Sequence, residues 1–178
     1  EGEYAYAGQL ILQGVLPFVE VYNMKMPGIY AAYAVVLALF GQTPFGIHIG
    51  LLVVNIASTV LLFVTARRYM EPVPALIAAI SFLCFTLNSG VLGAFAHATH
   101  FVVLFGLAGF YVLLRPAKSL RWYDAVSAGL LFGCAFMMKQ HAAPFIAVAG
   151  VYLFWRLRSD ANVSVALKAL SLALFIVG

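Results

Sequence analysis

The sequence predicts an all-helical membrane protein, with about six transmembrane helices and further helices lying along the outer membrane face. Two observations carry this prediction. Only 9% of the residues are charged and the mean hydropathy is +1.03, whereas about a quarter of the residues of a soluble domain are charged. The apolar runs are also continuous, whereas the strands of a transmembrane β-barrel alternate apolar and polar residues. A polytopic bundle of spanning helices is the class that remains.

Residues 1–43 are predicted to form an outer loop with juxtamembrane helices, ahead of a single bundle over residues 44–178. The stretch 3–14 places Tyr4 and Ala7 on one helical face, a short amphipathic pattern suited to the membrane interface. The run 27–40 begins with a proline that suits a first helical turn, but it measures only about 21 Å. Since a hydrocarbon core is about 30 Å thick, we expect this helix to lie along the outer interface.

The bundle divides into six segments that could cross or nearly cross a bilayer, for which about 20 residues are needed. Polar interruptions such as MEPVP at 70–74 and KQHAAP at 139–144 separate them. The predicted spans are 44–67, 73–94, 97–115, 123–139, 142–157 and 163–178. The last run reaches the end of the chain without a cap, so we expect the chain to be part of a longer protein, truncated at both ends.

The loop charges give the predicted orientation. With 27–40 at the interface, almost all loop Arg and Lys residues fall on one side, which the positive-inside rule makes cytoplasmic. If 27–40 instead crosses the membrane, Lys25 and the N-terminal carboxylates become cytoplasmic, and the rule alone does not choose between the two arrangements. In the favoured arrangement the outer side collects Glu1, Glu3, Glu20, Lys25, His97, His100, Lys139 and His141.

Ionisable groups at a membrane are costly, so those on the outer side are candidates for function. Each also has an ordinary alternative. Glu1 and Glu3 would complement the dipole at a helix start, and Lys25 would anchor its helix by extending its ammonium to the headgroups. His97 and His100 are spaced to share a helical face, which permits a metal pair, but no carboxylate or cysteine nearby completes a ligand set.

The other polar and aromatic candidates are similarly open. Lys139 and His141 would be ordinary flanks at the end of an apolar helix, and Tyr4 and Tyr22 fit an aromatic interface belt. His48 is isolated near the outer end of its helix, and we expect it only to pack there. Two cysteines lie in apolar runs and are interpreted as small buried hydrophobes, Cys84 and Cys134.

The stretch EGEYAYAGQLILQGVLPFVEVYNMKMPGIYAAYA resembles the first outer loop of the GT-C membrane glycosyltransferases, in the protein O-mannosyltransferase and aminoarabinose-transferase-like group. The pattern is an acidic pair before a Tyr-Ala step, a Gly-x-x-Pro-aromatic turn (Gly14 to Phe18), and a Lys-x-Pro step before an aromatic helix (Lys25 to Tyr33). AFMMKQHAAPF is similar to the stretch around the family's lysine at the outer end of a middle helix. The leading acid of the family's pair would precede Glu1, so Glu1 corresponds to the second acid and Glu3 is additional.

The resemblance implies an inverting glycosyltransferase that moves a sugar from a polyprenyl-phosphate donor to a glycan, lipid or protein acceptor. It implies an extracytoplasmic active site in a membrane protein, which we expect in the bacterial inner membrane. A general base must activate the acceptor hydroxyl, and cations must stabilise the leaving phosphate. The expected catalytic residues are Glu1 and Glu3, and the expected substrate-binding residues are Tyr4, Tyr22, Lys25, His97, His100, Lys139 and His141. We assign no metal ligands, keep a divalent cation as an alternative cofactor, and do not expect this chain alone to be a complete enzyme.

The competing class is a non-enzymatic transporter or channel subunit. A transporter should place polar residues near the bilayer midplane, on interrupted helices. The inner parts of the predicted spans are almost purely apolar, apart from small groups such as Asn55, Ser58 and Ser127. This pattern disfavours a polar transport path.

Overall fold

The computed structural model describes residues 1–16, 18–19, 25–88, 90, 93, 95–115 and 121–159, and this part of the chain contains helices and loops but no strand. The elements are α1 (Gly2–Leu12), α2 (Pro27–Phe40), α3 (Pro44–Ala66), α4 (Pro72–Thr86), α5 (Ala98–Leu113), α6 (Trp122–Met138), the 3-10 helix η2 (Gln140–Ala142) and α7 (Ala143–Ser159). The predicted all-helical class is confirmed for these residues. Tyr22 and the predicted span 163–178 lie outside them.

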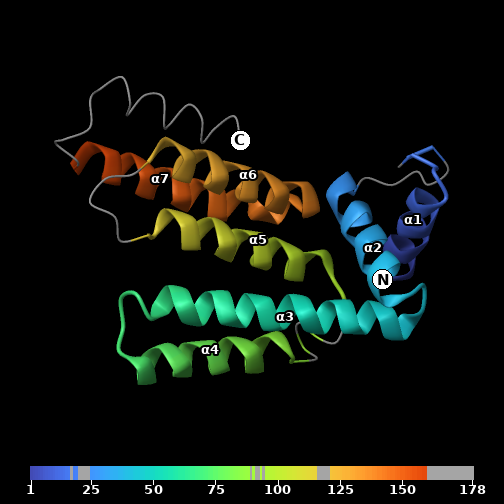
Figure 1. Cartoon of the computed structure of the whole chain (residues 1–178), viewed down its shortest axis with the longest axis horizontal. Coiled ribbons are helices and arrows are strands. Elements are labelled where there is room, and N and C mark those ends of the chain that lie inside the picture. The colour runs from blue at the N-terminus through green and yellow to red at the C-terminus, as the bar shows by residue number, and fades with distance from the viewer. Residues whose placement is uncertain are drawn as a thin grey trace.

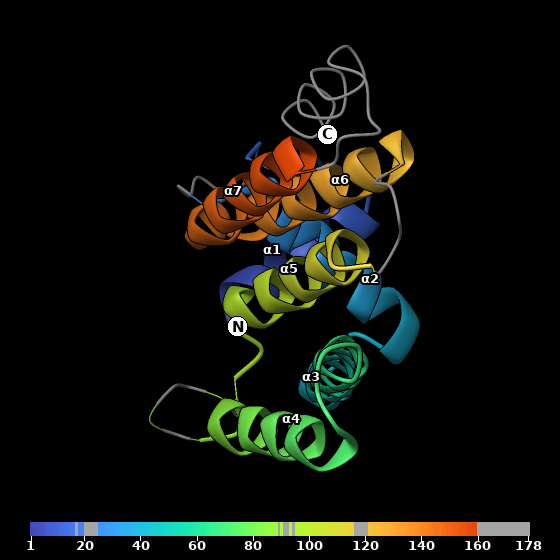
Figure 2. The same ribbon diagram turned by 90° about the vertical axis from the view of Figure 1, so that its left-hand side faces the viewer.

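The helices form a bundle with a cap at one end. Helices α3 to α7 run along the long axis of the molecule, and Figure 2 views α3 end-on. Helix α4 packs on α3, α3 packs on α5, and α5 packs on α6. Helices α1 and α2 pack against each other and run across the bundle at the end where the N-terminus lies (Figure 1). The prediction that α1 and α2 are juxtamembrane helices remains a prediction.

Most helix starts follow from the sequence. Prolines occupy the first position of α2, α3 and α4, where a missing N–H costs nothing. Thr43 caps α3 by accepting a hydrogen bond from the Gly46 N–H at 3.1 Å. The helix predicted over 73–94 is wrong at its end, because α4 stops at Thr86. Asn88 follows, and its side-chain oxygen accepts from the Gly90 N–H at 2.7 Å, a local turn that competes with continued helix.

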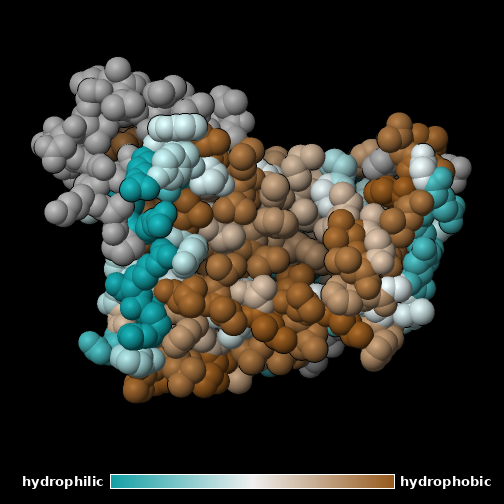
Figure 3. All heavy atoms as spheres, in the orientation of Figure 1, coloured by the Kyte–Doolittle hydropathy of each residue, from teal (hydrophilic) through white to brown (hydrophobic). Residues whose placement is uncertain are grey.

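The surface and the helix lengths fit a membrane protein in part. Helix α3, with 23 residues, is the one helix of the described ranges that is long and apolar enough to cross a bilayer by length and composition, while α2, α4, α5 and α6 are shorter apolar helices. Figure 3 shows apolar surface in the middle of the molecule, between hydrophilic patches at the two ends of its long axis. The arrangement is plausible for a membrane, and six spans remain a prediction.

Arginines gather at the end of the bundle opposite α1 and α2. The Arg68 guanidinium lies 3.7 Å from the centre of the Tyr111 ring and donates to the Tyr111 carbonyl at 2.6 Å. Arg156 donates to the Arg115 carbonyl at 3.0 Å. These contacts join the ends of α3, α5 and α7, so arginines predicted to share one membrane face do lie together.

Helix α2 approaches α6 so closely that only glycine fits at the crossing. A Cβ atom at Gly28 would lie 2.6 Å from the Met137 carbonyl oxygen, which is well inside van der Waals contact. The contact holds the start of α2 against the last turn of α6. Two residues that flank this crossing, Lys25 and Lys139, are thereby kept near each other.

The crossing predicts a sharp difference between two glycine substitutions. Gly28→Ala should lower the free energy of unfolding by about 1–3 kcal/mol, because α2 must move off α6. Gly2→Ala is the matched control, since a Cβ at Gly2 meets nothing within 4 Å and alanine is the better helix former. Thermal melting of the detergent-purified protein measures both. Equal melting temperatures for the two variants would contradict the tight crossing.

Candidate functional site

A small cavity of about 180 Å³ lies where α1, α2, α5 and α6 meet, and we call it the basic pocket. Lys25, two residues before the start of α2, lines one side of it. Lys139, the C-cap residue of α6, lines it as well. Its walls are Tyr4, Lys25, Met26, Ile29, Ala98, Met138, Lys139, Gln140 and His141. Four of the residues predicted from the sequence, Tyr4, Lys25, Lys139 and His141, therefore come together here, although they are far apart in the chain.

The electrostatics of the basic pocket favour an anion. Burial lowers the pKa of Lys139, and the positive charge of Lys25 lowers it further. Burial also lowers the pKa of His97, with Lys139 as the next contribution and Lys25 among the smaller ones. Lys25 and Lys139 thus place two positive charges at one small cavity. An anionic ligand between them would relieve their repulsion, and perturbed pKa values of this kind are typical of functional sites.

A much larger apolar groove of about 850 Å³ adjoins the basic pocket and is walled by α2, α3, α5 and α6. Met138 lines both cavities, and Gly28 of the groove lies between Met26 and Ile29 of the basic pocket. The other walls are aliphatic and aromatic side chains such as Val35 and Phe105. The two cavities together offer a cationic end and a long apolar end to one ligand.

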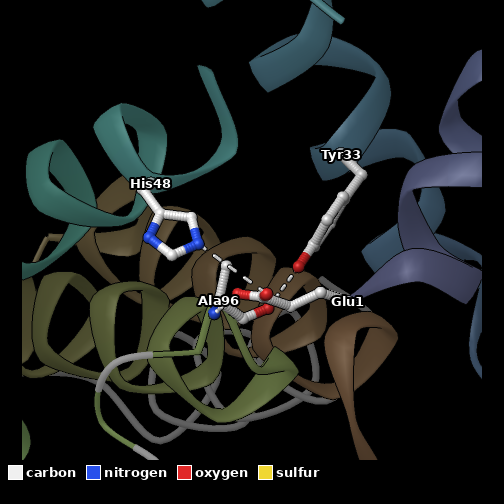
Figure 4. Close-up of polar contacts among 4 residues, drawn as sticks. All are labelled: Glu1, Tyr33, His48 and Ala96. Carbon is white, nitrogen blue, oxygen red and sulfur yellow. Dashed lines mark hydrogen bonds and ion pairs between the residues drawn. The ribbon is translucent and has the colours of Figure 1, made fainter. Parts of the chain in front are cut away.

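The Glu1 side chain binds a backbone amide outside its own helix. Its carboxylate accepts a hydrogen bond from the Ala96 N–H, and the Tyr33 hydroxyl donates to the Ala96 carbonyl (Figure 4). Ala96 is only 1% exposed. Glu1 is the N-cap residue of α1, as a carboxylate at a helix start was expected to be, but its side chain makes no cap hydrogen bond to the helix. Its second oxygen, Oε2, lies 3.8 Å from the His48 Nε2, so His48 does more than pack.

Glu3 is exposed and lies in the first turn of α1, where a carboxylate complements the helix dipole. Its Oε1 accepts a hydrogen bond from the Tyr30 hydroxyl at 3.4 Å. Burial, together with the nearby Glu3 charge, raises the pKa of Tyr30 to about 12, so the phenol remains a donor at neutral pH. Of the two N-terminal acids, Glu3 thus binds α2, whereas Glu1 binds the loop before α5 and lies near α3.

The two histidines of HATH do not form a pair. His97 precedes α5 as its N-cap residue, and its Nδ1 lies 2.9 Å from the Thr99 hydroxyl oxygen. His100 is 8% exposed, and its Nδ1 lies 3.0 Å from the Asn55 side-chain oxygen of α3. After burial, the charges of Lys139 and, more weakly, Lys25 lower the pKa of His97. His100 instead lines a separate cavity. The shared helical face predicted from their spacing is wrong, because the helix begins only at Ala98.

A divalent cation has no ligand set in the described part of the chain. No three His, Cys, Asp or Glu side chains there lie close enough together to hold one. The two free cysteines, Cys84 and Cys134, are both exposed, so the expectation that they are buried is wrong. Sequence reasoning also missed Tyr33 and Ala96. Tyr33 lies within the stretch that resembles the family, but its bond is to a backbone atom that carries no sequence signal.

A family model for dolichyl-phosphate-mannose-protein mannosyltransferases matches residues 24–178, which is most of the chain. The chain belongs to this family. It is therefore a member of a family of integral membrane glycosyltransferases, which in general use polyprenyl-phosphate sugar donors, and the GT-C resemblance is confirmed. The match includes Lys25 and Lys139, and begins after the two N-terminal acids. No curated protein and no solved structure gives a significant match to the chain.

The bond between Tyr33 and Ala96 predicts the outcome of removing one hydroxyl. Tyr33→Phe should lower the free energy of unfolding by about 1–3 kcal/mol, because the buried Ala96 carbonyl loses its partner. Tyr6→Phe is the matched control on α1, because Tyr6 is 51% exposed. Urea or thermal unfolding in detergent measures the difference. A Tyr33→Phe variant as stable as Tyr6→Phe would mean that the bond contributes nothing.

Proposed function

We propose that this protein transfers a sugar from a polyprenyl-phosphate donor to a hydroxyl group of an acceptor at the outer membrane face. The observation that carries the proposal is the contact between the basic pocket and the apolar groove, which share Met138. A polyprenyl phosphate has the same two parts, an anionic head joined to a long hydrocarbon tail. Family membership supports this chemistry over the transporter alternative.

In the proposed complex the donor phosphate lies between Lys25 and Lys139. Negative charge grows on the phosphate oxygen as the glycosidic bond breaks, so fixed cations there stabilise the transition state more than the ground state. Burial lowers the pKa of Lys139 most, and the charge of Lys25 lowers it further, so the two ammonium groups repel each other. The phosphate would bring them the counter-charge that the described residues around the pocket do not provide.

The proposed reaction is a single displacement. The acceptor oxygen attacks the anomeric carbon, the bond from that carbon to the phosphate oxygen breaks, and the bonding electrons leave with the polyprenyl phosphate. The anomeric configuration is inverted. A carboxylate, proposed as Glu1, takes the acceptor proton. The Ala96 N–H fixes one of its oxygens, which leaves Oε2 on the side of His48 for the proton.

The proposed membrane arrangement follows from the two ends of the bundle. Six spans, with the arginine-lined end in the cytoplasm, would put the basic pocket outside, as the positive-inside rule requires. The acceptor would be an extracytoplasmic glycan, lipid or protein, and the membrane is proposed to be the bacterial inner membrane. The position of the basic pocket under the crosswise helices α1 and α2 supports a site at headgroup level.

The phosphate role of Lys25 predicts a large kinetic effect. Lys25→Gln in the intact membrane protein should lower turnover by about 10²–10³, because a charge-assisted contact that strengthens toward the transition state is lost. Lys25→Arg should rescue only part of the activity, since the guanidinium is planar and longer than the ammonium. Transfer of radiolabelled sugar from a polyprenyl-phosphate donor measures both rates.

The control for this experiment is Arg158→Gln, which removes an exposed cation from the last turn of α7, at the other end of the bundle. It should leave turnover unchanged. Thermal melting of all three variants separates loss of catalysis from loss of folding. Normal turnover in a well-folded Lys25→Gln protein would contradict the phosphate-binding role of Lys25. It would indicate that Lys25 only anchors its helix at the headgroups.

The groove predicts an effect that depends on the length of the donor lipid. Ala31→Trp would fill part of the apolar groove from α2, so it should raise KM for a long-chain donor at least about tenfold. A donor with a short, water-soluble lipid should be affected much less. Ala38→Trp is the matched control, because Ala38 is exposed on the same helix outside the groove. Equal effects on both donors would contradict tail binding in the groove.

A further inference from the structure

A second polar cavity, of about 330 Å³, lies between α3, α4 and α5 and plays no part in the proposed reaction so far. We call it the α4 pocket. It is lined by Asn55, Ser58, Phe82, Phe85, Thr86, Thr99, His100 and Val103. Water occupies about 30 Å³ per molecule in the liquid, so the α4 pocket is far larger than a site for one structural water. Its volume lies at the lower end of the range for sites that bind small molecules, about 300–1,000 Å³.

A buried amide lines the α4 pocket, and one side-chain contact uses only part of its hydrogen-bonding capacity. Asn55 is only 3% exposed, and its side-chain oxygen is 3.0 Å from His100 Nδ1. The amide nitrogen has no partner among the described residues. No fully enclosed side-chain nitrogen or oxygen in that part of the chain lacks a hydrogen bond, so an unpartnered amide nitrogen borders open space, and Asn55 lines the α4 pocket. If the amide is turned over, its oxygen borders that space instead, and the conclusion is the same.

The lining of the α4 pocket selects a neutral ligand. The described lining residues include no Asp, Glu, Lys or Arg, so neither a phosphate nor an ammonium group would find a counter-charge. Hydrogen-bonding groups come from Asn55, Thr86 and Thr99, and aromatic faces come from Phe82 and Phe85. A sugar ring combines hydroxyl groups with a face of C–H bonds. A sugar ring is therefore a small neutral ligand that matches both kinds of wall.

The α4 pocket lies next to the basic pocket. Ala98 lines the basic pocket and Thr99 lines the α4 pocket, so adjacent residues of the first turn of α5 separate the two cavities. The Thr99 hydroxyl oxygen also lies 2.9 Å from the His97 Nδ1. Burial lowers the pKa of His97 most, and the charge of Lys139 lowers it further. A sugar in the α4 pocket would thus lie on the other side of one helical turn from the donor phosphate.

We propose that the α4 pocket is a binding site for a neutral sugar ring, held by the Asn55 amide and the Thr86 hydroxyl and stacked on Phe82 or Phe85. The ring belongs to the donor or to a glycosylated acceptor. This inference rests on the proposed function for the identity of those two substrates, but the binding itself is measured without any transfer reaction.

Protection of an introduced cysteine tests the proposal in the intact membrane protein. Thr86→Cys, in a background in which Cys84 and Cys134 are replaced by alanine, places a thiol in the pocket. The probes are methyl glycosides of mannose, glucose and galactose, with inorganic phosphate as the anionic comparison. At about ten times a millimolar dissociation constant, a bound glycoside should slow maleimide labelling about tenfold. The matched control is the native Cys84 with Cys134→Ala, because Cys84 is exposed on the same helix outside the pocket lining.

Protection of Thr86→Cys by at least one glycoside, with no protection of Cys84, is the expected result. Val103→Cys, on the opposite wall, repeats the measurement if Thr86→Cys does not fold. Protection by phosphate as well, unchanged labelling with every glycoside, or a thiol that is inaccessible even without ligand would each overturn the proposal. The last result would mean that another segment of the protein covers the pocket.

Kinetics then separate the two sources of the sugar. Thr86→Val should raise KM about fivefold for the donor alone if the donor sugar binds, or for the acceptor alone if an acceptor sugar binds. Thr59→Val, on α3 outside the pocket lining, should change neither KM. Glycoside protection in a protein without transfer activity would support sugar binding in the α4 pocket and contradict the proposed function. Transfer activity without glycoside protection would support the proposed function and contradict sugar binding in the α4 pocket.

Discussion

The backbone of Ala96 is the point on which the outer part of the structure depends. Glu1 binds its N–H and Tyr33 binds its carbonyl, so one buried residue joins the start of α1, the middle of α2 and the loop before α5. A backbone amide that is buried must find partners, and here both partners come from the crosswise helices. The loop before α5 is thereby fixed, and with it the positions of His97 and Ala98 beside the basic pocket.

The combination of a cationic pocket with an apolar groove explains how one site can hold an amphiphilic donor. Neither part is specific alone, because lysines flank many membrane helices and grooves between apolar helices are common. The two cavities meet at Met138, so the lysine side chains of the basic pocket lie next to the apolar groove. This junction exists because Gly28 lets α2 cross directly over the end of α6. A contact between two backbones therefore sets the geometry in which, in the proposed complex, an ammonium group would meet the donor phosphate.

Much of the fold was predictable because its signals are local. Apolar runs and helix-starting prolines such as Pro27 and Pro44 gave the helices, and loop charges gave the common face of Lys25 and Lys139. The failures came from interactions that depend on tertiary structure. Every residue except proline has a backbone N–H, so nothing in the sequence marks Ala96 as the partner of Glu1. The bond between Asn55 and His100 depends on the relative height of two helices. The predicted helix ran past the end of α4 because the prediction gave more weight to the apolar composition of the stretch than to the turn at Asn88.

The unusual length of α3 has a consequence for how the protein sits in lipid. Asn55 meets His100 near the start of α5, and Arg68 meets Tyr111 near the end of α5. The first turns of α3 therefore rise about 13 Å beyond the start of α5, at 1.5 Å per residue, and stand beside α2. In the proposed membrane arrangement, α3 would therefore set how far the proposed reaction site stands from the bilayer. In thinner or thicker membranes the mismatch would be absorbed at the arginine end, where long side chains can follow the headgroups.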